Sequence, residues 1–213
     1  MEYIKIPTVN KRAEDGSKKL VEGEWRDDTI QYLSALPFYW QEKIDGTNIR
    51  VIWDGHKIFF GGRTDNASIP STLLNRLNEL FMNPETEELF EQKFGKGKFI
   101  LYGEGFGEKI QSNGSGGNYI EGTDFALFDV YYCDQNMWLT RESVHDIAVS
   151  FGLREPDIVD ICTVEQAIEY VKTKPKSHIG TADMEGLVGR PMYELRDRRG
   201  NRIIVKVKVR DYT

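Results

Sequence analysis

The strongest constraint on the fold is a pair of short strands joined by a tight turn. Residues 49–60 alternate between apolar and polar side chains on either side of Asp54-Gly55. This dipeptide closes two-residue hairpins because its backbone accepts the positive φ angles that such turns need. Another strand is predicted just upstream, over 38–43. Tight hairpins build antiparallel sheet, whereas parallel strands need long crossover connections. The chain is therefore expected to contain an antiparallel sheet.

Helices are predicted as separate segments rather than as a crossover after every strand. Pro70 precedes apolar residues at helical spacing up to Phe81, and Asn83-Pro84 is typical of the start of a second helix, which ends near Lys93. Residues 105–122 are rich in Gly, Ser and Asn and predict a mobile loop. This mixture predicts an α+β fold. The other predicted elements are helices over 140–151 and 163–171 and strands over 99–104, 124–132, 185–189, 192–195 and 202–209.

Composition is that of a folded protein in water. Hydrophobic residues make up 39% and charged residues 29% of the 213 positions, which excludes disordered and fibrous classes. At this length a single domain over residues 1–213 is expected. No apolar run approaches the ~20 residues that span a bilayer, and the first residues lack the apolar segment of a signal peptide. We expect a cytoplasmic protein with no membrane partner.

Cysteine and histidine patterns exclude two common kinds of site. Cys133 and Cys162 are far apart in the sequence and form no C-x-x-C pair, so neither a disulfide framework nor a thiolate zinc site is indicated. The histidines are scattered without a second ligand three or four residues away, which leaves a zinc hydrolase unsupported. A reducing compartment fits this usage.

Charge is unevenly distributed along the chain. The net charge is −6, which opposes nucleic-acid binding by bulk electrostatics. Residues 190–210 nevertheless carry eight basic side chains against two acidic ones, and acids concentrate over 79–91. The basic run can face phosphate groups, or it can be a solvated hairpin.

A glycine-rich motif, Gly103-Glu104-Gly105-Phe106-Gly107, does not predict a phosphate loop. Its spacing is G-x-G-x-G, and neither a Walker lysine nor a helix-forming sequence follows it. No kinase catalytic motif appears downstream. Dinucleotide-binding and kinase functions are therefore disfavoured.

The most informative motif is Glu42-Lys43-Ile44-Asp45-Gly46-Thr47-Asn48. Its K-x-D-G element alone arises by chance in about one chain of this length in twenty, so its neighbours decide its meaning. The motifs that follow it along the chain are Arg63, Tyr102-Gly103-Glu104-Gly105, Ala126-Leu127-Phe128-Asp129, Glu185-Gly186-Leu187-Val188 and Lys206-Val207-Lys208. Taken in this order, the motifs resemble those of the covalent nucleotidyltransferases, the class of polynucleotide ligases and capping enzymes. The E-K-x-x-G-T-N start is most similar to the RNA ligase 2 family, which includes phage-type and RNA-editing ligases.

The chemistry of this class explains the residue types. A lysine amine attacks a nucleotide α-phosphate only after it has lost its proton. Lys206 and Lys208 alternate on a predicted strand and so share one face, where they can hold the phosphate and lower the pKa of Lys43. A bound Mg²⁺ would add positive charge, and Gly46 lets the nucleotide approach the backbone.

The resemblance implies a role for each matched residue. Lys43 is the nucleophile, Lys206 and Lys208 assist catalysis, and Glu185 serves the metal and the first chemical step. The role of Asp45 is left open, because some RNA ligase 2 members carry a different polar residue there. Each residue taken alone has an ordinary interpretation as a surface charge or a core side chain. The implied nucleotide contacts are Arg63 and Glu104 at the ribose or its surroundings, Phe128 and Val188 around the adenine, Glu42 beside the residue that contacts the base edge, and Asn48 near the metal waters or the reactive phosphate.

The implied protein is an ATP-dependent RNA ligase with a nucleotidyltransferase core. The core has two mostly antiparallel sheets with flanking helices, and the nucleotide is held between the sheets. Its cofactors are ATP and Mg²⁺ or Mn²⁺. It acts through lysyl-AMP, AMP transfer to a 5′-phosphate end and sealing to a 3′-hydroxyl. Its partners are RNA ends in nicked duplex, it is a monomer, and a bacteriophage enzyme acting in RNA repair in its host's cytoplasm fits.

Other functions stay open at this stage. A DNA ligase core, a guanylyltransferase and a non-catalytic module that binds RNA ends or nucleotides all fit the fold. Only five residues follow Lys208, so we expect no C-terminal OB or helical domain.

Overall fold

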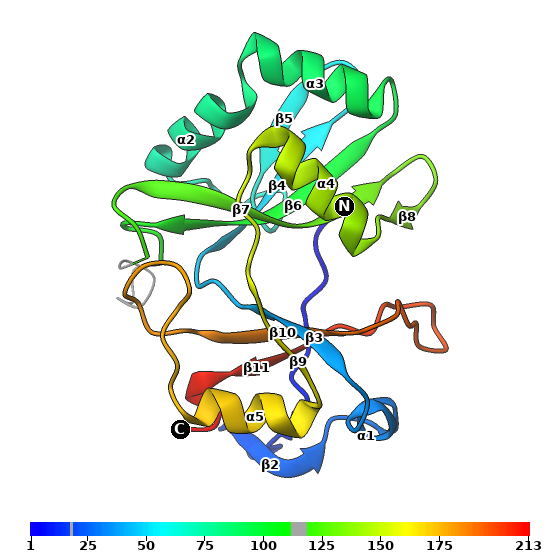
Figure 1. Cartoon of the computed structure of the whole chain (residues 1–213), viewed down its shortest axis with the longest axis vertical. Helices are drawn as coiled ribbons and strands as arrows, with labels where there is room; N and C mark the ends of the chain where they lie inside the picture. The colour runs from blue at the N-terminus through cyan, green and yellow to red at the C-terminus, as the bar shows by residue number, and fades with distance from the viewer. Residues whose placement is uncertain (18, 112–118) are drawn as a thin grey trace. The chain divides into compact units, whose positions relative to one another are not determined.

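The computed structural model describes residues 1–17, 19–111 and 119–213. The elements divide into two compact units (Figure 1). The first unit consists of Met1–Tyr3 and Asp45–Pro156, and the second of Ile4–Ile44 and Asp157–Thr213. All the strand pairs within the sheets are antiparallel. The predicted α+β fold with two mostly antiparallel sheets is confirmed.

The first unit is built on a five-stranded sheet with the strand order β5-β4-β6-β7-β8. The predicted hairpin around Asp54 is confirmed, because Asp54 Oδ1 accepts hydrogen bonds from the backbone N–H groups of His56 and Lys57 at 2.9 and 2.8 Å. These bonds tie the turn to its own aspartate side chain. The strands are β4 Thr47–Trp53, β5 Ile58–Gly61, β6 Phe99–Gly107, β7 Thr123–Tyr132 and β8 Met137–Trp138.

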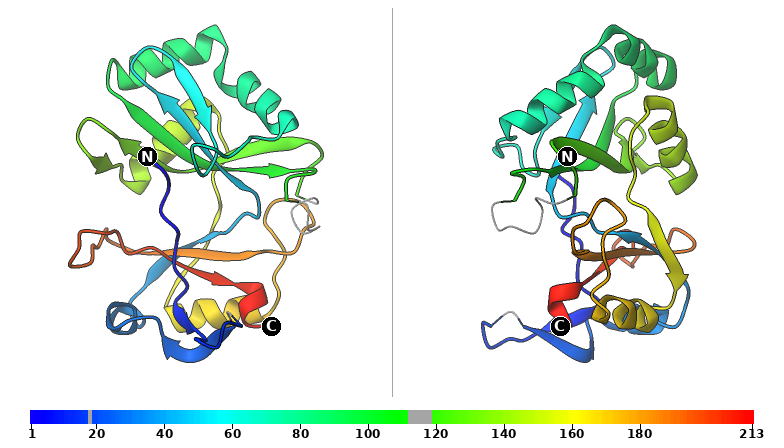
Figure 2. Two further views of the ribbon diagram at one scale, coloured as in Figure 1. Left: turned by 180° about the vertical axis from the view of Figure 1, so that it is seen from behind. Right: turned by 60° about the vertical axis from the view of Figure 1, so that its left-hand side comes forward.

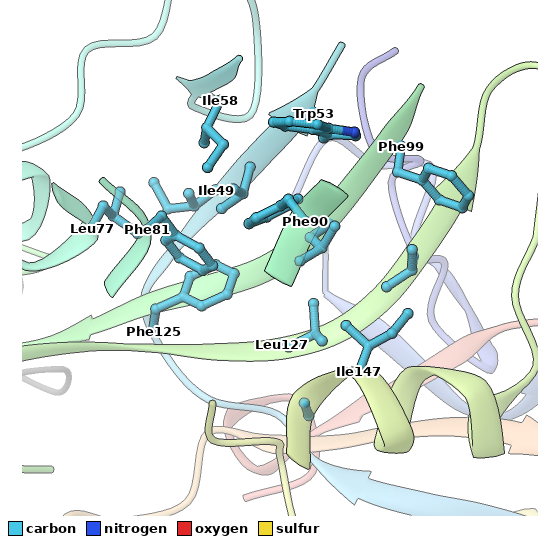
Figure 3. Close-up of a cluster of buried hydrophobic side chains, with 14 of the residues drawn as sticks. Ile49, Trp53, Ile58, Leu77, Phe81, Phe90, Phe99, Phe125, Leu127 and Ile147 are labelled. Atoms are coloured by element: carbon cyan, nitrogen blue, oxygen red, sulfur yellow. The ribbon is translucent and has the colours of Figure 1, made fainter. Parts of the chain in front are cut away.

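Three helices cover one face of this sheet and share its core: α2 Ser71–Phe81, α3 Pro84–Phe94 and α4 Arg141–Phe151 (Figures 1 and 3). Asn83 and Thr140 cap α3 and α4 through their side-chain oxygens. The start at Asn83 is the one that the sequence predicts. Ile49 and Trp53 of β4 point into this core. The alternate residues of the same strand, including Asn48, lie on the opposite face.

The second unit is built on a four-stranded sheet with the strand order β11-β10-β3-β9. Its strands are β3 Phe38–Glu42, β9 Ile158–Cys162, β10 Gly186–Pro191 and β11 Val205–Lys208. Helices α1 Asp28–Leu33 and α5 Val164–Lys172 pack on one face (Figure 2). A small hairpin, β1 Asn10–Arg12 with β2 Leu20–Trp25, belongs to the same unit. The predicted helix over 163–171 is confirmed as α5, with Thr163 and Gln166 forming a capping box.

Several boundaries differ from the sequence predictions. Strand β6 continues to Gly107, because the glycines beyond the predicted end pack closely against other groups. A Cβ on Gly105 would lie 2.3 Å from Leu73 Cδ2, and one on Gly107 would lie 2.2 Å from Gly122 O. The predicted loop over 105–122 therefore begins later, and its residues 112–118 lie outside the described part of the chain. The predicted strand over 192–195 is wrong, since these residues bend into a loop closed by one bridge between Arg196 and Arg202.

Helix lengths bear on the question of membrane insertion. Within residues 1–17, 19–111 and 119–213, no helix is long and apolar enough to cross a bilayer.

Candidate active site

The face of the second unit's sheet opposite α5 carries most of the predicted catalytic residues. Val188 of β10 lies directly opposite Lys206 of β11 on one side and Gln41 of β3 on the other. Directly opposite residues of antiparallel strands point to the same face. The intervening residues, such as Leu187 and Val207, enter the core with α5. Strand alternation therefore separates a polar face from the core.

At one end of this face, Lys43, Glu185 and Lys208 form an ion-paired triad. Lys43 Nζ donates to Glu185 Oε2 at 2.5 Å, and Lys208 Nζ donates to Glu185 Oε1. The three side chains are 22%, 12% and 12% exposed, respectively. Charge-assisted hydrogen bonds of this kind are stronger than neutral ones, more so when water is partly excluded. The predicted catalytic residues Lys43, Glu185 and Lys208 are thus in contact.

Backbone contacts hold this triad in register. Lys43 N donates to Gly186 O at 2.8 Å, and Val209 N donates to Glu185 O at 3.0 Å. Gly186 is needed here because a Cβ would lie 2.1 Å from Val207 O, closer than any side chain permits. The positions of Lys43 and Glu185 therefore depend on β10 lying close against β11.

Burial and neighbouring charges shift the pKa values of Glu185 and Lys206. Burial opposes ionisation of Glu185, but the charges of Lys43 and Lys208 outweigh it and hold its pKa below the ordinary value. Burial and the charges of Lys208, Lys43 and Lys5 lower the pKa of Lys206 to about 8, although Glu185 opposes this. The cluster thus holds an excess of positive charge that an anion would relieve.

Glu42 lies on the other face of the sheet from Lys43. Its side chain is 2% exposed, and its carboxylate accepts hydrogen bonds from Ser177 Oγ at 2.5 Å and from His178 N at 2.9 Å. Neighbouring residues of a strand point to opposite faces, which explains the difference. Its role beside the base edge stays a prediction.

The first unit holds the remaining predicted site residues. Asn48 lies directly opposite Glu104, so both point away from the helix-covered core. Asn48 Oδ1 is buried and has no hydrogen-bond partner among the described residues. Phe128 lies at a β-bulge in β7, and its ring packs against the Tyr3 ring in an edge-to-face arrangement with the ring centroids 5.1 Å apart. Gly46 lies close against the backbone of Gly105, where a Cβ would be 2.2 Å from the carbonyl oxygen.

Arg63 is exposed in the loop after β5. The loop is held by Arg50, whose Nε donates to Gly62 O at 2.8 Å and whose NH2 group pairs with Asp65 at 2.8 Å. Arg50 itself is 3% exposed, so it anchors the loop from beneath. Arg63 is thereby presented from a fixed loop of the first unit.

The amino-acid sequence of the chain matches the model of one protein family. The model described as RNA ligase matches residues 36–208, which spans most of the chain. The chain belongs to the RNA ligase family. Among curated proteins, none matches this RNA ligase family member.

Solved structures of Naegleria gruberi RNA ligase are similar in fold. A lysine-to-methionine mutant with AMP and Mn is 22% identical with a TM-score of 0.63, covering 86% of this chain and 53% of that one. A glutamate-to-alanine mutant with ATP and Mn is 20% identical with a TM-score of 0.65, covering 95% and 55%. This RNA ligase family member therefore shares their fold and spans about half of their length.

Sequence reasoning missed several residues around these positions. Gln41 shares the polar face with Val188, and its place two residues before Lys43 on a strand was a usable signal. Lys5 reaches the charge cluster from the N-terminal segment, and Tyr3 packs on Phe128. Nothing local in the sequence marks these two, because their partners are far away along the chain.

The donor set of this RNA ligase family member fits a metal that keeps other ligands. Within the described residues, no three His, Cys, Asp or Glu side chains gather as a cage. Glu185 is the carboxylate within the lysine cluster. Mg²⁺ is commonly held by one or two carboxylates together with waters and substrate phosphates, so this arrangement suits a metal that arrives with a nucleotide.

Proposed function

We propose that the chain is the catalytic core of an ATP-dependent RNA ligase that acts through lysyl-AMP. The observation that carries this is that Lys43 and Lys208 both donate hydrogen bonds to Glu185, and that their charges act on the neighbouring Lys206. Family membership supports ligation of RNA. The ATP- and AMP-bound Naegleria ligases, which also contain Mn, support ATP and a divalent metal as cofactors.

In the first step Lys43 attacks the α-phosphorus of ATP. Lys43 first gives up a proton to solvent, and its contact with Glu185 Oε2 at 2.5 Å positions Nζ. The Nζ–phosphorus bond then forms as the bond from phosphorus to the bridging oxygen breaks, and its electron pair leaves on pyrophosphate. The remaining extra proton on Nζ passes to water. Lys206 and Lys208 stabilise the charge that develops on the phosphoryl oxygens.

Two further steps complete the reaction. AMP passes from Lys43 to the 5′-phosphate of an RNA end, and a 3′-hydroxyl then displaces AMP to seal the strand. We propose nicked duplex RNA as the substrate, repair as the setting and a monomer as the working form. The cluster of lysines suits all three steps, because each passes through a negatively charged phosphoryl group.

The other predicted residues would bind the nucleotide. Asn48 brings a buried amide oxygen without a partner among the described residues, a group that a donor such as a metal-bound water would satisfy. Arg63 and Glu104 are proposed at the ribose, Phe128 and Val188 at the adenine, and Glu42 beside the base edge. A divalent metal at Glu185 would supply positive charge at the phosphates.

The test is covalent labelling with α-labelled ATP or GTP in the presence of Mg²⁺, followed by denaturing electrophoresis. We expect label from ATP alone and complete loss in Lys43→Arg, because a guanidinium stays protonated and cannot attack. Lys19→Arg, at an exposed lysine outside the cluster, should label normally. Undiminished labelling of Lys43→Arg would remove the central claim.

The alternative functions predict other outcomes of the same experiment. Label from GTP indicates a guanylyltransferase, and nucleotide binding without label indicates a non-catalytic module. If ATP labels the protein but only DNA nicks are sealed, the chain is a DNA ligase core.

A further inference from the structure

A groove of about 860 Å³ lies between helix α1 and the loop over 192–204 in the second unit. The helix contributes Tyr32 to its lining, and the loop contributes Arg198 and Arg199. Both segments lie on the same side of this unit in Figures 1 and 2. The groove therefore combines an aromatic ring with two cations, outside the cluster formed by Lys43, Glu185 and Lys208.

The turn that carries the two arginines is fixed by Asp197. Its carbonyl oxygen accepts a hydrogen bond from Gly200 N at 2.9 Å, and its Oδ1 accepts bonds from Arg199 N and Asn201 N, both at 2.8 Å. Arg198 and Arg199 are thus the central residues of a four-residue turn and are exposed to solvent. Within the described part of the chain, neither side chain forms an ion pair. Their charges are therefore available to a ligand.

The acidic side chains of the groove are partly engaged by the backbone. Among the described residues, its lining holds four arginines and three aspartates. Asp197 caps the turn, and Asp27 caps α1 by accepting a hydrogen bond from Ile30 N at 2.9 Å. Asp28 is the third aspartate. Positive charge therefore predominates among the side chains that a ligand would meet, and such a surface attracts phosphate groups.

Tyr32 presents its aromatic ring to solvent at this groove. Ile30 and Leu33 of the same helix are buried in the core of the second unit, which turns Tyr32 outward. Tyr32 is 83% exposed, and among the described residues its ring packs on no other ring and its hydroxyl forms no hydrogen bond. Burial in the core therefore does not use this ring. Its face can stack on the base of a nucleic acid.

Unpaired RNA has the chemistry that this combination recognises. In a duplex the bases stack on one another and present only their edges, whereas the bases of a single strand can stack on aromatic side chains. Cations beside the ring hold the phosphates, as in other grooves that bind single strands. A duplex would engage the arginines but not the ring, so the exposed Tyr32 favours a single strand.

The groove borders the lysine cluster. Arg26 and Asp27 line both this groove and a second one that contains Lys206 and Lys208. An RNA strand whose reacting phosphate lies at these lysines can therefore continue toward Tyr32 along a concave surface.

We propose that the groove between α1 and the loop over 192–204 binds an unpaired segment of the RNA substrate. Tyr32 stacks on a base, and Arg198 and Arg199 hold phosphates. The inference rests on the proposed function, since it takes RNA as the ligand. It adds a substrate feature to that function: RNA with an unpaired stretch near the end to be joined binds more tightly than fully paired RNA.

Equilibrium binding tests the groove without turnover. Fluorescence anisotropy is measured with a labelled single-stranded RNA of about 10 nucleotides, within the length that one such groove covers, and with a blunt duplex RNA of the same length. The variants are Tyr32→Ala and Tyr32→Phe. Tyr193→Ala is the matched control, because Tyr193 is 82% exposed on the same loop as the arginines but does not line the groove. Lysyl-AMP formation is measured in every variant.

We expect Tyr32→Ala to bind the single-stranded RNA about tenfold more weakly, because one base stack is lost. Tyr32→Phe should bind like the parent protein, since it keeps the ring. Duplex binding and lysyl-AMP formation should be unchanged in both variants. Salt separates the two kinds of contact: Tyr32→Ala keeps the salt slope of the parent, whereas Arg198→Ala/Arg199→Ala lowers it, because phosphate contacts release counterions.

Three results would overturn the proposal. Equal affinity of the parent and Tyr32→Ala for the single-stranded RNA would exclude stacking on this ring. An equal loss of affinity in Tyr193→Ala would show that the groove is not the site. An equal loss of duplex binding in Tyr32→Ala would make the groove a site for paired RNA.

The two proposals fail in distinguishable ways. If the parent protein never forms lysyl-AMP, the proposed function fails, while RNA binding still tests the groove. If the parent forms lysyl-AMP but its binding of single-stranded RNA does not depend on Tyr32, the groove proposal fails alone.

Discussion

The two lysines of β11, Lys206 and Lys208, have different surroundings. Lys208 donates to Glu185 within the triad, whereas the pKa of Lys206 is lowered to about 8 by burial and by the charges of Lys208, Lys43 and Lys5. Lys206 is therefore the residue whose protonation responds to an arriving phosphate. A negative ligand beside it restores the ammonium form and raises its pKa.

This predicts a pH dependence of ATP binding. Between the pKa of about 8 in the free protein and the higher pKa in the complex, binding takes up a proton. Affinity is therefore fully present below pH 8 and falls as the pH rises above it, up to about tenfold per pH unit for one proton. The measurement is calorimetry of ATP binding to Lys43→Arg, which prevents turnover, in a series from neutral to alkaline pH.

The control for that prediction replaces Lys206 in the same background. The double variant Lys43→Arg/Lys206→Arg keeps a charge that does not titrate in this range, so its affinity should lose the dependence above pH 8. An identical slope in both proteins would show that another group is responsible.

At the scale of elements, the site depends on the close pairing of β10 with β11. Gly186 lies opposite Lys208 in the register, and its carbonyl oxygen accepts the Lys43 backbone hydrogen bond. The pairing of β10 with β11 thus positions both the carbonyl group that holds the Lys43 backbone and the carboxylate of Glu185. A methyl group added at Gly186 would therefore disturb the positions of Lys43, Glu185 and Lys208 without changing any of these three side chains.

We predict that Gly186→Ala abolishes lysyl-AMP formation. The added Cβ would lie 2.1 Å from Val207 O, so the strands must separate, at a cost of about 1–3 kcal/mol in unfolding free energy. Urea unfolding measures that cost and labelling measures activity. Gly200→Ala is a matched control, because its glycine has a positive φ but open space around it. Labelling of Gly186→Ala at the parent rate contradicts the prediction.

At the scale of the whole molecule, the distribution of charged residues decides where RNA can bind, more than the net charge does. The basic run over 190–210 does not form one surface: Lys206 and Lys208 belong to the cluster, Arg202 is buried, and Arg196 pairs with Glu194 at 2.7 Å. Arg198 and Arg199 remain exposed at a tight turn that Asp197 caps. These two are the residues of the run best placed to contact an RNA backbone.

We predict that sealing of pre-adenylated nicked RNA falls steeply with salt although the protein carries a net charge of −6, because phosphate contacts release counterions. The double variant Arg198→Ala/Arg199→Ala should bind RNA more weakly, with a smaller salt slope. Single-turnover sealing at several salt concentrations measures both. A slope equal to that of the parent places the RNA elsewhere.

Local features of the chain were predictable from its sequence. The hairpin at Asp54-Gly55 and the helix caps at Asn83, Thr140 and Thr163 depend on residues only a few positions apart. The order of the nucleotidyltransferase motifs is likewise a property of the sequence, and it led to the RNA ligase family before any geometry. Errors arose where distant packing overrode local composition, as in glycine-rich β6.

The sequence by itself determined the hairpin at Asp54-Gly55, the helices α2 to α5, the motif order and the family, because each follows from residue types at fixed spacing. It did not predict β1, β2, α1, β8 or β9. Only the tertiary structure decided which charges meet. Lys43 and Glu185 are 142 positions apart, and their contact depends on the pairing of β3 with β10. The same pairing turns Glu42 to the opposite face, and the N-terminal segment brings Lys5 to Lys206. Strand register sets these partnerships, and register is fixed by the packing of a whole core rather than by neighbouring residues.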